Sequence, residues 1–122
     1  KGFQELHTAD EVDAVMHDTQ GTVLVIVNSV CGCAAGAARP GIVKAVTSSA
    51  KLPTHLTTVF AGVDREATDK ARAYMAPYPP SSPAIALFKD GNLVHMIERR
   101  HIEGRSADMI AGNLLAAFEE HC

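Results

Sequence analysis

The sequence has few of the features that mark membrane proteins or disulfide-rich secreted proteins. It contains no tryptophan, and its longest strongly apolar run, Val23 to Val27, is about a quarter of the roughly 20 residues that a membrane-spanning helix needs. It has only three cysteines, an odd number that does not form a secreted disulfide framework. A reducing cytoplasm is therefore the expected compartment, and no membrane partner is expected.

Clusters of charge are also scarce. The formal net charge is -3 at pH 7, and the eleven lysines and arginines are scattered apart from Arg99-Arg100. Because no basic stripe is present to release counterions from a phosphate backbone, nucleic acid is not an expected partner. With 47% hydrophobic and 20% charged residues in a chain of 122, the composition predicts one globular domain over residues 1–122.

Strand and helix patterns alternate along the chain. Strands are predicted at Phe3–Leu6, Thr22–Val27, His55–Ala61, Ala84–Phe88 and Leu93–Ile97. Helices are predicted after a capping box at Thr8–Glu11 and from Ala34 to about Ala50, the latter with a break at Pro40-Gly41. A third helix is predicted after a cap at Asp64, with one face formed by Ala67, Ala71, Tyr74 and Met75. A fourth is predicted after a cap at Ser106. Strands that alternate with helices indicate an α/β fold.

The sheet of this fold can be predicted in more detail. Thr22 to Val27 is apolar on both faces, which is typical of a central strand covered by helices above and below. Asp90-Gly91 predicts a tight hairpin between the last two strands. We therefore expect a three-layer α/β/α sandwich, whose mixed sheet has central parallel strands and an antiparallel C-terminal hairpin.

Two cysteines separated by one glycine, Cys31-Gly32-Cys33, follow the predicted central strand and precede a predicted helix. Both thiols could bind a metal, they could form a disulfide across Gly32, or they could pack as small apolar residues. A thiol at a helix N-terminus experiences the positive end of the helix dipole, which lowers its pKa and makes it a nucleophile. We therefore assign nucleophilic attack to Cys31 and resolution to Cys33, with Gly32 permitting the tight geometry.

The other candidate residues have weaker support from the sequence. A structural zinc site needs four ligands, and no second paired motif accompanies the cysteines, so no metal site is assigned. The potential additional ligands are scattered: His7, His17, His55, His95, His101 and Cys122. None of these histidines is assigned as a general base. Arg39 is most simply a solvated side chain, with attraction of an anionic thiol substrate as the alternative.

The motif Val27-Asn-Ser-Val-Cys31-Gly-Cys33-Ala-Ala-Gly, followed by Ala38-Arg-Pro40 and preceded by Gly2-Phe-x-Glu-Leu6, resembles the bacilliredoxin family. The order of elements, with Ser82-Pro83 before the hairpin, resembles the thioredoxin fold across nearly the whole chain. The family usually carries further residues before the Gly-Phe segment, so we expect that the quoted chain lacks an N-terminal piece.

These resemblances imply a function and a site. The family implies a cytoplasmic enzyme without a bound cofactor that uses bacillithiol as its thiol co-substrate. Its partners would be bacillithiolated cytosolic proteins and low-molecular-weight thiols, and Cys31 would take the thiol onto itself. Disulfide isomerase or general disulfide reductase activity is the alternative, and a non-catalytic metal-binding module is an alternative of another class. The thioredoxin fold implies a cis peptide at Ser82-Pro83, with Ser82, Pro83 and Gly32 contacting the substrate.

Overall fold

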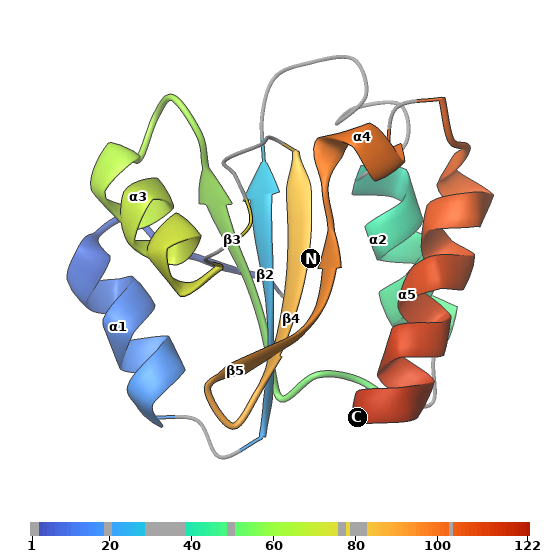
Figure 1. Cartoon of the computed structure of the whole chain (residues 1–122), viewed down its shortest axis with the longest axis horizontal. Coiled ribbons are helices and arrows are strands. Elements are labelled where there is room, and N and C mark those ends of the chain that lie inside the picture. The colour runs from blue at the N-terminus through green and yellow to red at the C-terminus, as the bar shows by residue number, and fades with distance from the viewer. Residues whose placement is uncertain are drawn as a thin grey trace.

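A computed structural model describes residues 3–18, 21–28, 39–48, 51–75, 78, 83–102 and 104–122. The strands are β1 (Gln4–Glu5), β2 (Thr22–Asn28), β3 (His55–Phe60), β4 (Ala84–Lys89) and β5 (Asn92–Ile97). The helices are α1 (Ala9–Asp18), α2 (Arg39–Ser48), α3 (Arg65–Tyr74), α4 (Arg99–Ile102) and α5 (Ala107–His121). Figure 1 shows the sheet between two layers of helices, with α1 and α3 on one face and α2 and α5 on the other. The predicted three-layer α/β/α sandwich is confirmed.

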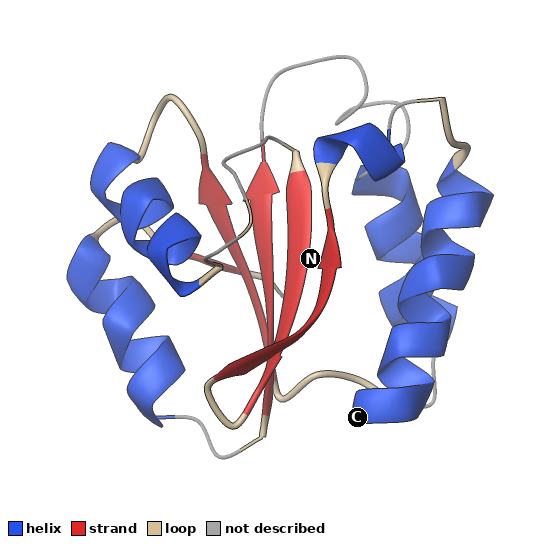
Figure 2. Cartoon of the chain, in the orientation of Figure 1, coloured by secondary structure: helices blue, strands red, loops and turns tan. Residues whose placement is uncertain are grey.

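The five strands form one mixed sheet in the order β1-β3-β2-β4-β5 (Figure 2). β1 and β2 both pair with β3 in parallel, whereas β4 is antiparallel to both β2 and β5. The predicted central strand is β2, whose residues 22–27 are all buried. The carboxyl ends of β1, β3, β2 and β5 therefore share one edge of the sheet, and the segment that contains the cysteines leaves from this edge.

Each face of the sheet has its own apolar core. Leu24 and Ile26 of β2 pack with α2 and α5, whereas Val23, Val25 and Val27 pack with α1 and α3. This alternation follows from the period of two in a strand, where successive side chains point to opposite faces. Because both faces of β2 must be apolar, its β-branched sequence is explained by burial on two sides.

Two local patterns in the sequence are confirmed in atomic detail. The hydroxyl oxygen of Thr8 accepts from the backbone N–H of Glu11 at 3.1 Å, and the Glu11 carboxylate accepts from the N–H groups of His7 at 2.6 Å and Thr8 at 3.3 Å. This reciprocal arrangement is the predicted capping box of α1. At the hairpin, Asp90 and Gly91 have φ values of 52° and 83°, as the tight turn requires.

Two details of the helices differ from the prediction, and a third is not tested. α2 contains no break between Arg39 and Ser48, but the predicted break at Pro40-Gly41 depends on residues before Arg39 that lie outside the described part of the chain, so it stays a prediction. Asp64 precedes α3 as predicted, but its side chain makes no capping hydrogen bond. The short helix α4 was not predicted, because a single turn gives too little periodicity to recognise.

The tyrosine predicted on the inner face of α3 ties that helix to α1. The Tyr74 hydroxyl donates to the Asp13 carboxylate at 2.7 Å and lies 2.9 Å from His17 Nε2, and Lys70 Nζ lies 3.5 Å from the same carboxylate. Burial, followed by the bond to Asp13, raises the pKa of Tyr74 to about 12. His17 is near the end of α1 that leads to the amino end of β2, so this network is remote from the cysteine segment.

The predicted cap of α5 provides a test of the fold. Ser106 has extended backbone geometry, and its hydroxyl oxygen accepts from the N–H of Met109 at 3.2 Å. We expect Ser106→Ala to lower the free energy of unfolding by about 1 kcal/mol, because that N–H loses its acceptor. Urea denaturation measures the change. Ser106→Asp retains an acceptor and should match the parent, so an equal loss in both variants would contradict the capping role.

Candidate active site

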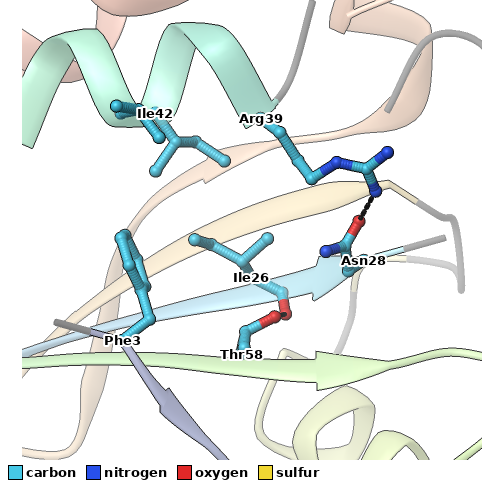
Figure 3. Close-up of a pocket in the computed structure, with 7 residues that line it drawn as sticks. Phe3, Ile26, Asn28, Arg39, Ile42 and Thr58 are labelled. Atoms are coloured by element: carbon cyan, nitrogen blue, oxygen red, sulfur yellow. Dashed lines mark hydrogen bonds between the residues drawn. The ribbon is translucent and has the colours of Figure 1, made fainter. Parts of the chain in front are cut away.

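The two ends of the cysteine segment are joined by a hydrogen bond. The segment starts after Asn28, the last residue of β2, and ends before Arg39, the first residue of α2. Arg39 Nη1 donates to Asn28 Oδ1 at 2.8 Å in a half-buried position (Figure 3). A hydrogen bond from a charged donor is stronger than one between neutral groups, so this contact holds the start of α2 against the end of the central strand.

Pro83 lies beside the start of the same segment. It is buried and immediately precedes β4, whose Ala84 pairs with Val27. One further step along this antiparallel register places Pro83 opposite Asn28. The assigned residues Cys31, Gly32, Cys33 and Ser82 lie outside the described residues, as do the expected helical turns before Arg39. Their roles, together with the cis peptide at Ser82-Pro83, stay predictions.

A cavity of about 190 Å³ opens beneath the Asn28–Arg39 contact. Figure 3 shows Phe3, Ile26 and Ile42 converging on it, with Thr58 beside them and Arg39 turned toward Asn28. It is lined by Phe3, Ile26, Asn28, Arg39, Ile42, Val43 and Thr58. The cavity therefore has an apolar interior, and a cationic side chain lies at its margin.

A second hollow of about 260 Å³ shares Asn28 and Thr58 with the first. It is lined by Glu5, His7, Asn28, Thr58, Phe60, Val63 and Asp64. Glu5 pairs with Thr58, and Thr58 pairs with Ile26. Since paired residues project from the same face of a sheet, the floors of both hollows belong to the face that α2 covers. We call the two hollows together the edge groove.

Acidic side chains surround His7 at the far end of the edge groove. His7 Nδ1 lies 3.1 Å from the Asp64 carboxylate, and His7 Nε2 lies 3.3 Å from that of Glu5. The hydrogen bond with Asp64, followed by the negative charge of Asp64, raises the pKa of His7 above its ordinary value. The carboxylate that the sequence assigned to a helix cap therefore forms an ion pair in the groove.

This ion pair predicts a dependence of stability on pH. Because the pKa of His7 is higher in the folded protein, its contribution to stability is fully present below the unfolded pKa, about 6.5, and is lost as the pH rises through the folded pKa. We expect urea midpoints of the parent and His7→Gln to differ at pH 6 and to converge by pH 9. Asp64→Asn should remove the same pH dependence. A constant difference between the parent and His7→Gln would contradict the ion pair.

Three further features of the described residues bear on function. They contain no group of three or more histidine, cysteine or acidic side chains arranged to hold a metal ion. Within the same residues, no helix is both long enough and apolar enough to cross a membrane. Cys122 is an exposed free cysteine at the end of α5, and Figure 1 places this terminus at the opposite end of the sheet from the carboxyl end of β2.

The arrangement of strands and helices is that of thioredoxin. The Fasciola hepatica thioredoxin structure superposes with a TM-score of 0.63, at 16% identity over 95% of this chain and 99% of that one. The oxidized thioredoxin O2 of Arabidopsis thaliana gives 0.64, at 16% identity over 96% of this chain and 95% of that one. The chain is thus a thioredoxin-fold protein, as the order of its elements predicted.

The sequence comparisons define the family within this fold. A profile of the family described as "Disulphide isomerase" matches residues 1–122. A bacilliredoxin of Cytophaga hutchinsonii is 64% identical over 98% of this chain and 87% of its own length, and one of Bacillus licheniformis is 56% identical over 99% and 84%. The chain belongs to the bacilliredoxin family and is a thiol–disulfide oxidoreductase.

Proposed function

We propose that the protein removes bacillithiol, or a similar low-molecular-weight thiol, from mixed disulfides on cytoplasmic proteins. The observation that carries this proposal is the position of Cys31-Gly32-Cys33, between the end of the central strand and α2, in a chain 64% identical to a bacilliredoxin. In sheets of this type, chemistry gathers beyond the carboxyl ends of the strands. The helix that the sequence predicts from Ala34 would also favour a thiolate at its N-terminus.

The proposed reaction is an exchange of sulfur–sulfur bonds. The Cys31 thiolate attacks the sulfur of the small thiol, the disulfide to the substrate protein breaks, and the protein sulfur leaves as a thiolate. Cys31 then carries the small thiol. The Cys33 thiolate can displace it to form a Cys31–Cys33 disulfide, or a second small thiol can attack the adduct and leave with the first as a symmetrical disulfide. No bound cofactor takes part, and the Cys31–Cys33 disulfide is returned to two thiols by external thiols.

The test is a comparison of two substrates with the reduced protein. One is a bacillithiolated protein, and the other is a protein with scrambled disulfides. We expect release of bacillithiol from the first to be faster than recovery of native disulfides in the second, because one exposed mixed disulfide needs a single exchange. Isomerisation is the second candidate function, since the matching family profile is described as "Disulphide isomerase". Faster recovery of the scrambled protein would favour it and overturn our proposal.

A further inference from the structure

We propose that the edge groove holds the small thiol during exchange, and that it selects thiols carrying both a carboxylate and an ammonium group. This inference rests on the proposed function, because it assigns a site to the small-thiol half of the mixed disulfide. The groove connects two regions of opposite charge across an apolar floor. Arg39 lies at one end, and Glu5 and Asp64 lie at the other.

The groove lies within reach of the reacting sulfur. Asn28 lines both hollows and precedes Cys31 by three residues. A fully extended chain spans at most about 3.6 Å per residue, so chain connectivity keeps the Cα atoms of these two residues within about 11 Å. A thiol of the size of a short peptide covers this distance, and it can therefore occupy the groove while its sulfur meets Cys31.

The walls of the groove expose apolar side chains that a ligand would cover. Val43 of α2 is 49% exposed in the first hollow, and Val63 is 70% exposed in the second. The half-buried side chains of Phe3 and Phe60 line the first and the second hollow, respectively. Small-molecule sites typically combine such apolar surface with a few polar groups that set the orientation. The two hollows together have the size that small molecules occupy.

The charges determine the class of ligand. The Arg39 guanidinium attracts a carboxylate. At the other end, protonated His7 offsets only one of the two carboxylates that it contacts, so Glu5 and Asp64 retain a net negative charge that attracts an ammonium group. A thiol derived from an amino acid, such as bacillithiol or glutathione, carries both groups. An uncharged thiol such as 2-mercaptoethanol carries neither, and the groove offers it no charged contact.

The experiment measures selectivity with mixed disulfides of one neutral peptide. Its adducts with bacillithiol, glutathione and 2-mercaptoethanol are compared by kcat/KM. The selectivity ratio is kcat/KM for a charged adduct, either bacillithiol or glutathione, divided by kcat/KM for the 2-mercaptoethanol adduct. We expect this ratio to fall about tenfold in Arg39→Gln and in Glu5→Gln, because each variant loses one charged contact. Arg39→Lys retains the charge and should recover part of the ratio. Lys51→Gln removes a cation that pairs with Glu119 outside the groove, and it should leave the ratio unchanged.

Binding can be measured separately from exchange. In the Cys31→Ser, Cys33→Ser double variant, reduced glutathione should shift the NMR methyl resonances of Val43 and Val63. No shift, or an unchanged selectivity ratio in Arg39→Gln and Glu5→Gln, would overturn the groove as the thiol site. Shifts caused by the peptide but not by the thiol would also overturn it and would assign the groove to the substrate protein. Failure of the wild-type protein to exchange any adduct would instead refute the proposed function, and the binding measurement would still test the groove.

Discussion

Replacing Cys31 with serine is expected to reduce release of the small thiol to the uncatalysed rate. The reason is that a thiolate attacks a disulfide, whereas a serine hydroxyl stays protonated near neutral pH and does not. Cys33→Ser is expected to retain the first attack and to accumulate a mixed disulfide on Cys31, because the resolving thiol is gone. Intact mass measurement of each variant after exposure to oxidised bacillithiol detects the adduct, and peptide mapping locates it.

The third cysteine provides the matched control for this experiment. Cys122 is exposed at the end of α5. This terminus lies at the opposite end of the sheet from the carboxyl end of β2, which leads into the cysteine segment (Figure 1). Cys122→Ser should therefore have the exchange rate of the parent. Parental activity in Cys31→Ser, or an adduct found mainly on Cys33 or Cys122, would show that Cys31 is not the attacking residue.

The features predicted correctly from the sequence are those fixed by local chemistry or by strict periodicity. The apolar run of β2 identified the central strand, because burial on both faces leaves no polar position. Asp90-Gly91 identified the hairpin, because both turn residues need positive φ. Thr8 and Glu11 identified the start of α1 through groups only three residues apart. Each of these patterns is complete within a short stretch of sequence.

The edge groove was not predicted, because its residues come together only through the sheet register. Phe3 before β1, Thr58 in β3 and Arg39 in α2 lie far apart in the sequence and share no recognisable spacing. Asp64 shows the same limit at the level of a single side chain. The position of Asp64 before α3 fits a helix cap. In the fold, its carboxylate instead pairs with His7, which lies 57 residues earlier in the sequence. Competition between a local and a long-range partner cannot be decided from spacing.

Gly41 has a role in packing that its sequence context does not reveal. Pro40-Gly41 predicted a break in the helix, since both residues disfavour helix interiors. The structure does not test this break, because the residues before Arg39 lie outside those described, but it places Gly41 within α2 at a close contact with another helix. A Cβ atom at this position would lie 2.9 Å from the carbonyl oxygen of Ala107 and 2.9 Å from two side-chain carbons of Ile110, both in α5.

We therefore expect Gly41→Ala to destabilise the protein by about 1–3 kcal/mol, even though alanine is the better helix former. The part of α2 around Gly41 must move away from α5 to admit the methyl group, because Ile110 is almost fully buried and the Ala107 carbonyl belongs to the backbone. Urea denaturation measures the loss. Since Arg39 lies two residues earlier and contacts Asn28, the same movement should also slow exchange at Cys31.

Gly112→Ala is the matched control for this substitution. Gly112 also lies in a helix, but a Cβ atom there would meet nothing within 4 Å. The same change should therefore stabilise the protein by up to about 1 kcal/mol, through helix propensity alone, and leave exchange unchanged. The two variants are thus expected to shift the free energy of unfolding in opposite directions. Stabilisation by both variants would show that α2 and α5 can separate without cost, and that Gly41 does not set their distance.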